Sequence, residues 1–206
     1  MMGIIICLVV GYAFGCFSTG YIVGKMNHID IRNYGSGNSG TTNALRTLGF
    51  KAGLLTFLGD ALKAIIPIML IRFYFPAPEG NLQLLLLYTG LGVVLGHNFP
   101  AWLHFKGGKG IAATAGVMLA FDWRFGLAAA VIFVILVAIT RYVSLGSLAL
   151  SLLFPIGVLI FYPGQIHMLI VSLIFTVLAY VKHRGNITRL LNGTERKLGQ
   201  KIEINK

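Results

Sequence analysis

Long, uninterrupted apolar runs limit this chain to a membrane fold. Seven such runs follow one another along the 206 residues, and none shows the alternation of a barrel strand. Only 11% of the residues are charged, which leaves too little polar surface to cover a soluble globule. Inside a bilayer the backbone is restricted to helices or closed barrels, because no water satisfies its polar groups. We therefore predict an all-α integral membrane protein.

The runs predict a bundle of seven transmembrane helices in a single membrane-embedded domain, residues 1–206. They are Ile4–Gly24, Leu54–Phe75, Leu82–Leu95, Ile111–Phe121, Phe125–Thr140, Leu145–Tyr162 and Ile166–Val181. The fourth run is short, since eleven helical residues span about 16 Å. With the N-terminus outside and seven crossings, fourteen of the seventeen basic residues lie on the inner side. This agrees with the positive-inside rule and predicts a cytoplasmic C-terminus.

The net charge of +11 has a simple origin in such a protein. Positive inner loops and contacts with anionic membrane lipid account for most of it, so we expect no nucleic-acid partner. Residues 185–206 are predicted to be a cytoplasmic amphipathic tail, because Ile187, Leu190 and Leu191 share one helical face. The acidic residues are few and dispersed, so neither a metal site nor a cofactor is expected.

The first inner loop, residues 33–46, is rich in Gly, Ser, Thr and Asn and ends on Arg46. Successive backbone N–H groups of such a loop can form an anion-binding nest. Thr41 or Thr42 is predicted to cap a short helix that begins at Asn43. Arg46 would then lie one turn from the cap, where its planar guanidinium can bind phosphate through two hydrogen bonds. A flexible polar loop is the alternative interpretation.

The second inner loop, residues 96–110, ends in Gly107, Gly108, Lys109 and Gly110 directly before the fourth run. Glycines and a lysine at a helix start are typical of a phosphate site. The loop is not a Walker A motif, because that motif requires Ser or Thr after its lysine. A basic interfacial anchor is the alternative interpretation.

Four further polar residues have two interpretations each. Ser144 caps the sixth run or hydrogen-bonds a substrate, and His183 is structural or functional. Asp60 and Lys63 lie three residues apart inside the second run and can pair. We favour a structural pair that orders the inner loops, and the alternative is the gate of a small membrane transporter or channel.

The three polar segments resemble the motifs of the bacterial acyl-phosphate:glycerol-3-phosphate acyltransferase family. The first motif covers residues 36–46, the second residues 96–110, and the third His183–Ile187 with Gly193–Glu195. The resemblance implies an acyl-phosphate-dependent glycerol-3-phosphate 1-O-acyltransferase. A fatty acyl group passes from acyl phosphate to the 1-hydroxyl of glycerol 3-phosphate, and lysophosphatidate and inorganic phosphate are released. This is the first step of phospholipid synthesis, and we expect a monomer in the cell inner (cytoplasmic) membrane.

The resemblance also implies roles for individual residues. The catalytic candidates are Lys109, His183 and Arg46. The predicted glycerol-phosphate clamp consists of Ser36, Arg46, Lys109, His183 and Asn186. The predicted cradle for the acyl phosphate consists of Asn38, Thr41, Thr42, Gly107 and Gly108. The remaining substrate-binding candidates are Asn43, Ser144 and Glu195.

The sequence contains none of the strong-base machinery of other glycerolipid acyltransferases. No histidine is followed five residues later by an aspartate. An acyl phosphate already carries a good leaving group, so positioning and charge stabilisation can supply most of the catalysis. We expect the substrate phosphate to accept the hydroxyl proton, with His183 as the rival base. A transporter should show internal repeats, and a phosphatidyl-type transferase an Asp-rich metal motif, and neither pattern is found.

Overall fold

The computed structural model describes residues 1–77 and 80–200, and within these ranges it contains helices and no strand. The predicted all-α fold is therefore confirmed for the described chain. The last part of the predicted tail, residues 201–206, lies outside the described residues. The α-helices are α1 (Met2–Gly15), α2 (Thr19–Met26), α3 (Thr41–Leu48), α4 (Phe50–Tyr74), α5 (Leu82–Asn98), α6 (Ile111–Phe121), α7 (Trp123–Thr140), α8 (Val143–Phe161), α9 (Ile166–Lys182) and α10 (Arg184–Leu191).

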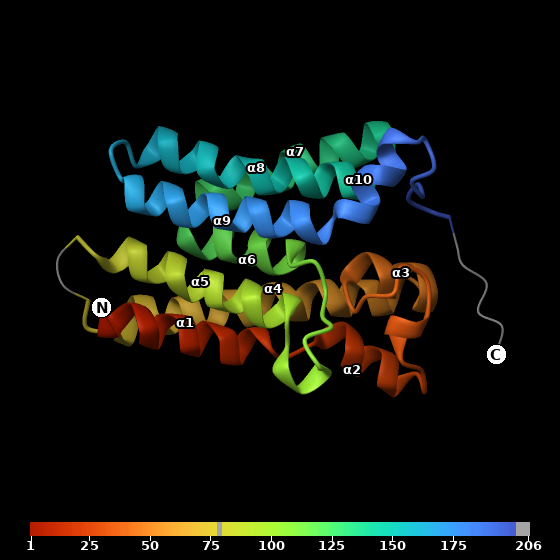
Figure 1. Cartoon of the computed structure of the whole chain (residues 1–206), viewed down its shortest axis with the longest axis horizontal. Helices are drawn as coiled ribbons and strands as arrows, with labels where there is room; N and C mark the ends of the chain where they lie inside the picture. The colour runs from red at the N-terminus through yellow and green to blue at the C-terminus, as the bar shows by residue number, and fades with distance from the viewer. Residues whose placement is uncertain (78–79, 201–206) are drawn as a thin grey trace.

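The long helices run side by side, and the short polar segments gather at one end of the bundle (Figure 1). Helices α2, α3 and α10 all lie at this end. Among the described residues, five segments are long and apolar enough to cross a membrane, or six if α9 and α10, bent by 63°, count as one span. Outward-facing residues of the long helices are apolar, as on α7, where the exposed set includes Leu127, Val131, Val134, Ile135 and Ile139.

The predicted span Ile4–Gly24 is confirmed as an apolar segment, Met2–Met26, long enough to cross a membrane, but its helix is interrupted. Helix α1 ends at Gly15, and α2 begins only at Thr19. The break exposes backbone carbonyls that side chains from elsewhere satisfy. Lys63 Nζ donates to the Phe17 carbonyl at 2.6 Å, and Trp102 Nε1 donates to the Cys16 carbonyl at 2.7 Å. Ser18, Thr19 and Gly20 at this point are too common inside membrane helices to predict a break, and the groups that stabilise it lie far along the chain.

Helices α1 and α5 pack at the closest distance that two backbones allow. Gly11 and Gly15 of α1 face Gly92 and Gly96 of α5, in two matching small-xxx-small patterns. A Cβ atom on Gly15 would lie 2.2 Å from the Val93 carbonyl oxygen. A Cβ atom on Gly92 would lie 2.3 Å from the Leu8 carbonyl oxygen. Only glycine fits at these positions. Because the two backbones touch here, the α1–α2 break, which directly follows Gly15, lies beside the end of α5.

Helix α6 has the predicted bounds, Ile111–Phe121, and packs against α4, α5, α7 and α8. Most of its residues are buried, and a Cβ atom on Gly116 would lie 2.6 Å from the Ala61 carbonyl oxygen of α4. The short helix is therefore an internal element of the bundle, and its N-terminus points toward the end where the polar loops gather.

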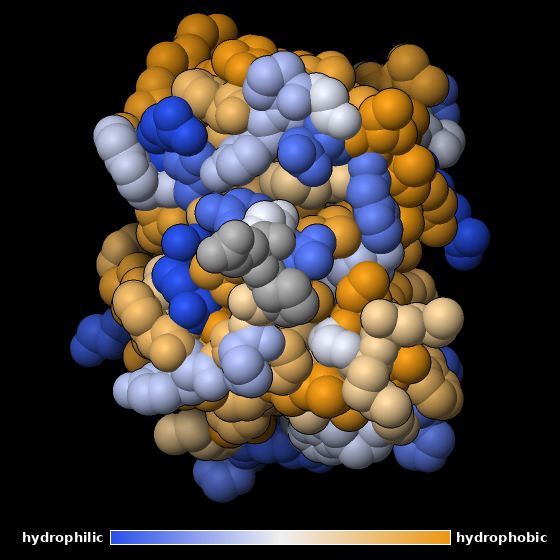
Figure 2. Space-filling model, turned by 90° about the vertical axis from the view of Figure 1, so that its left-hand side faces the viewer, coloured by the Kyte–Doolittle hydropathy of each residue, from blue (hydrophilic) through white to orange (hydrophobic). Residues whose placement is uncertain are grey.

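The opposite end of the bundle shows hydrophilic residues between hydrophobic ones (Figure 2). Both basic residues predicted to lie outside have structural partners there. Arg72 donates to the carbonyls of Ala120 and Phe121, which are free at the end of α6. Arg124 pairs with Asp122 at 2.6 Å. These contacts close this end by tying helix termini together.

The α1–α5 contact leads to a stability prediction. Gly15→Ala should lower the free energy of unfolding by about 1–3 kcal/mol, because the methyl group forces the two helices apart. Gly3→Ala is the matched control on the same helix, since its Cβ would meet nothing closer than 3.5 Å. Thermal unfolding in detergent, followed by tryptophan fluorescence, should show a lower midpoint for Gly15→Ala only. Equal midpoints for the two variants would contradict the close packing.

Candidate active site

A cavity of about 400 Å³ opens where the polar loops meet the helix bundle. Its walls come from the 33–46 loop, α3, α4, the start of α6, α7, α8 and the α9–α10 segment. Ten of the thirteen predicted site residues line it: Ser36, Asn38, Thr41, Thr42, Arg46, Lys109, Ser144, His183, Asn186 and Glu195. A second cavity of about 350 Å³ shares Ser36, Arg46, Lys109, Asn186 and Glu195 with the first. The structure thus brings the three polar motifs together in one place.

Asn43 organises the first loop from within. Its side chain is buried, and its Oδ1 accepts from the Ser36 backbone N–H at 2.8 Å. Its Nδ2 lies at 2.8–3.0 Å from the carbonyls of Ile31, Tyr34 and Asn38. Asn43 does not line the cavity, so the structure gives this predicted substrate-binding residue a scaffolding role instead.

The predicted cap of the first short helix is also wrong. Helix α3 begins at Thr41, and its N-cap is Gly40 with no side-chain cap. The threonine is therefore free for another partner. Thr41 Oγ1 and Arg46 Nε are both buried in the cavity wall without a hydrogen-bond partner in the described chain. Buried polar atoms are almost always hydrogen-bonded, so these two atoms indicate that the cavity takes a polar ligand.

The glycine loop differs from the expected phosphate cradle. The Gly107 N–H donates to the Asn98 carbonyl at 3.3 Å, and the Gly108 N–H donates to the His97 carbonyl at 3.1 Å. Both amides are therefore occupied inside the protein, and neither glycine lines the cavity. The loop instead presents Lys109 and the N-terminus of α6, whose first N–H groups have no partner within the helix. A helix N-terminus of this kind attracts an anion.

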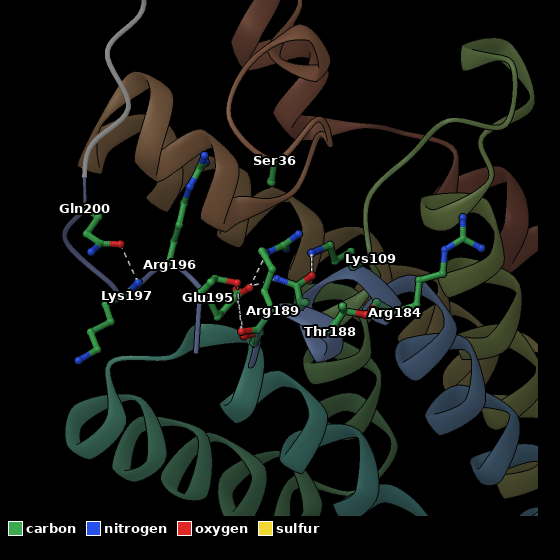
Figure 3. A network of polar contacts seen from close by, with 12 residues as sticks. Ser36, Lys109, Arg184, Thr188, Arg189, Glu195, Arg196, Lys197 and Gln200 are labelled. Carbon is green, nitrogen blue, oxygen red and sulfur yellow. Dashed lines mark hydrogen bonds and ion pairs between the residues drawn. The ribbon is translucent and has the colours of Figure 1, made fainter. Parts of the chain in front are cut away.

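Lys109 lies at the centre of the site and donates to Asn186 Oδ1 (Figure 3). Burial lowers the pKa of Lys109 to about 8, and the cations Arg189, Arg46 and Lys182 add to the effect. His183 donates from Nδ1 to the Ala179 carbonyl at 2.8 Å. Burial and the charge of Lys109 lower the pKa of His183 to about 4. At neutral pH the imidazole is therefore uncharged, and its free Nε2 is a hydrogen-bond acceptor.

Glu195 joins the third motif to α8 and α10. It accepts from Ser144 Oγ at 3.1 Å, from Asn186 Nδ2 at 2.7 Å and from Arg189 Nε at 2.8 Å (Figure 3). Burial acts to raise the pKa of Glu195, but the hydrogen bonds outweigh it, and the pKa lies below its usual value.

The predicted capping role of Ser144 is wrong, because α8 has Tyr142 at its N-cap and no side-chain cap.

The predicted Asp60–Lys63 pair is confirmed, with Lys63 Nζ 2.9 Å from Asp60 Oδ1.

The sequence did not indicate that Asp60 and His97 line the first cavity, called the main cavity below. It also missed Lys182, Arg184, Arg189 and Arg196, which line the second cavity. Their positive charge was visible in the tail, but nothing local in the sequence indicates which basic side chains turn toward the site.

Charge and shape together define the class of protein. The site combines a cluster of cations with an apolar groove inside a bundle of membrane-type helices, as expected of an enzyme that handles phosphorylated lipids.

Comparison with known proteins supports this class. The sequence profile described as glycerol-3-phosphate acyltransferase matches residues 5–193. A glycerol-3-phosphate acyltransferase of Clostridioides difficile is 46% identical over 200 residues, covering 97% of each chain. One of Thermoanaerobacter pseudethanolicus is 44% identical over 201 residues, covering 97% of this chain and 98% of the relative.

The fold is similar to that of a solved protein described as PlsY (YgiH), an integral membrane glycerol 3-phosphate acyltransferase. Its glycerol 3-phosphate form superposes with a TM-score of 0.84 at 33% identity, covering 95% of this chain and 96% of that one. Its lysophosphatidic acid form superposes with a TM-score of 0.81 at 32% identity. The chain belongs to the glycerol-3-phosphate acyltransferase family and is an integral membrane protein.

The Glu195 contacts lead to a second prediction. Glu195→Ala should lower the free energy of unfolding by about 1–3 kcal/mol, because it leaves buried donors of Ser144 and Asn186 without an acceptor. Thr194→Ala, at the exposed neighbouring residue, should change it by less than about 0.5 kcal/mol. Thermal unfolding in detergent measures both variants. A Glu195→Ala protein as stable as Thr194→Ala would show that these hydrogen bonds contribute little.

Proposed function

We propose that this protein transfers a fatty acyl group from acyl phosphate to the 1-hydroxyl of glycerol 3-phosphate, and that it releases lysophosphatidate and inorganic phosphate. The observation that carries the proposal is a single cavity with a cationic polar end and an apolar groove. Both substrates carry phosphate and one carries a long acyl chain, so such a cavity accommodates both. The relatives named for glycerol 3-phosphate, and the solved relative's lysophosphatidic acid form, support the acceptor and the product.

The polar end has enough positive charge for two phosphates. Arg46 and Lys109 line both cavities, and Lys182, Arg184, Arg189 and Arg196 surround the second one. Among the residues that the structure describes, Glu195 is the one acidic residue lining the second cavity. We assign glycerol 3-phosphate to the second cavity and its junction with the first. Its clamp then consists of Ser36, Arg46, Lys109 and Asn186, which line both cavities, and of His183 from the first. The acyl phosphate then takes the inner side, near Asn38, Thr41, Thr42 and the start of α6.

The apolar groove suits an acyl chain. Side chains of α4, α6, α7 and α8 line it, among them Phe57, Ala115, Phe133, Val137 and Leu150. Small residues on α6 leave room beside it, while the phenylalanines cover the walls. A chain held here extends away from the cations and toward the bilayer interior, so the carbonyl carbon lies at the junction between polar and apolar parts.

The reaction then requires few protein groups. The 1-hydroxyl oxygen of glycerol 3-phosphate bonds to the carbonyl carbon, and the carbon–oxygen bond to phosphate breaks, with its electron pair leaving on phosphate. The low pKa of His183, about 4, makes it a weak base. We therefore assign it to orienting the hydroxyl through Nε2, while the phosphate, with a second pKa of about 6, accepts the proton. Lys109 stabilises the negative charge that builds on the leaving phosphate.

We further propose seven membrane crossings, with the N-terminus outside and the C-terminus in the cytoplasm, and a place in the cell inner membrane. The gathering of the polar loops and α10 at one end supports this orientation (Figure 1). The cationic end would then face the cytoplasm, where a water-soluble phosphate ester is available. The lipid-exposed sides of the bundle would admit the acyl donor.

The proposed donor can be tested directly. Purified protein in lipid vesicles, given acyl phosphate and glycerol 3-phosphate, should release inorganic phosphate and form lysophosphatidate in equal amounts. The same protein given an acyl thioester and glycerol 3-phosphate should form no lysophosphatidate, because the inner anion site lacks its ligand. Efficient use of the thioester would refute acyl phosphate as the donor.

The lowered pKa of Lys109 predicts the alkaline limb of the pH profile. Lys109 is charged below its pKa of about 8 and neutral above it. Because the charged form binds phosphate, kcat/KM for glycerol 3-phosphate should fall as pH rises above about 8. Lys109→Arg, which stays protonated to above about pH 12, should remove this fall even if its maximal rate is lower. Hydrolysis of acyl phosphate without enzyme is the control, and an unchanged profile for Lys109→Arg would assign the limb to another group.

A further inference from the structure

We propose that the Nε2–H of His97 donates a hydrogen bond to the carbonyl oxygen of the acyl phosphate, and that Lys63 holds the imidazole in the tautomer required for this. The inference rests on the proposed function and adds a catalytic residue to it. His97 was part of the second motif, and the assignments above give it no chemical role.

Lys63 has three acceptors around its ammonium group. Nζ lies 2.6 Å from the Phe17 carbonyl oxygen, 2.9 Å from Asp60 Oδ1 and 2.9 Å from His97 Nδ1. An ammonium has only N–H donors and no lone pair, so it cannot accept a hydrogen bond from Nδ1. Nδ1 of His97 must therefore accept. In a neutral imidazole the hydrogen is then on Nε2.

Other protonation states fit this cluster poorly. A doubly protonated His97 would place two cations 2.9 Å apart in a buried region. A neutral Lys63 would leave the buried carboxylate of Asp60 without a countercharge, which is costly inside a membrane protein. The carboxylate thus keeps Lys63 charged, and the charged Lys63 sets the tautomer of His97. Asp60 and Lys63 are positioning residues in this scheme.

The glycine loop makes room for the donor. A Cβ atom on Gly108 would lie 2.1 Å from His97 Nε2, so only glycine lets the loop pass the imidazole edge. This explains the glycine although its own amide is already bonded. His97 lines the main cavity, and no hydrogen bond of the described residues uses its Nε2. An N–H on the cavity wall that has no protein acceptor is available to a ligand.

The composition of the cavity favours the carbonyl oxygen as that acceptor. Asp60 and His97 line the same cavity as the cations Arg46 and Lys109 and the apolar side chains, and Phe57 lies one turn before Asp60 on α4. The acyl carbonyl occupies the junction between the polar and apolar parts in the proposed binding mode. When the hydroxyl adds to the carbonyl carbon, the π electrons move onto the carbonyl oxygen. The Nε2–H stabilises that charge and keeps its proton while the phosphate leaves with the carbon–oxygen electron pair.

Two variants separate the donor role from a merely structural one. His97→Asn keeps an acceptor for Lys63 but has no group at the Nε2 position. His97→Gln keeps an amide donor there but loses the acceptor. We expect kcat with acyl phosphate to fall about 10²–10³-fold in His97→Asn, with KM for glycerol 3-phosphate within about threefold. His97→Gln should retain more of kcat although it disturbs Lys63.

The outcomes distinguish this inference from the proposed function. If the unaltered protein forms lysophosphatidate from acyl phosphate and His97→Asn is equally fast, the inference fails and the function stands. A His97→Gln protein slower than His97→Asn would equally overturn it. If the unaltered protein does not use acyl phosphate, both fail. Thermal unfolding checks that each variant is folded.

Nitrogen-15 NMR of histidine-labelled protein tests the tautomer independently of activity. The expected signals for His97 are an unprotonated Nδ1 and a protonated Nε2, identified by their absence in His97→Asn. A protonated Nδ1 would overturn the inference.

Discussion

A charged lysine inside the bundle determines much of this structure. The ammonium of Lys63 needs polar partners where lipid offers none, and it finds two hydrogen-bond acceptors and one carboxylate on three different elements. One is the carbonyl at the break between α1 and α2, one is its own helix α4, and one is the end of α5. This single group therefore ties together the segments from which both inner loops depart. The glycine contact between α1 and α5 makes the arrangement possible, because it lets the break approach α5 closely.

The site follows from this framework. The first loop is folded around the Asn43 side chain, and the second is fixed by two backbone hydrogen bonds to the end of α5. The third motif is held by Glu195, which connects α8 with α10. Each loop is thus stabilised by contacts of its own, and the polar atoms without a protein partner, such as Thr41 Oγ1 and Arg46 Nε, lie in the cavity wall. Rigid loops with unpartnered polar atoms suit catalysis that depends on positioning.

The sequence predicted the helical membrane fold and most helix limits, because apolar runs record where lipid surrounds the chain. Helix α6 has the predicted bounds. It also predicted which polar residues gather, since ten of thirteen line one cavity. It failed where the deciding partner lies far away in the chain. The α1–α2 break depends on Lys63 and Trp102. The inward orientation of Asn43 depends instead on how its own loop folds around it, which the composition of the loop does not reveal. The sequence suggested that Gly107 and Gly108 bind phosphate. The structure gives a different reason for both glycines, because a Cβ atom at either position would collide with His97.

The eleven-residue length of α6 has a further consequence. A hydrocarbon layer is about 30 Å thick, and such a helix covers only about 16 Å of it. The helix therefore cannot reach both surfaces of that layer by itself, so at least one of its ends lies within the layer when the helix stands along the membrane normal. In the proposed orientation and reaction, a recessed first turn would let a single-chain product form at the depth of the surrounding lipid.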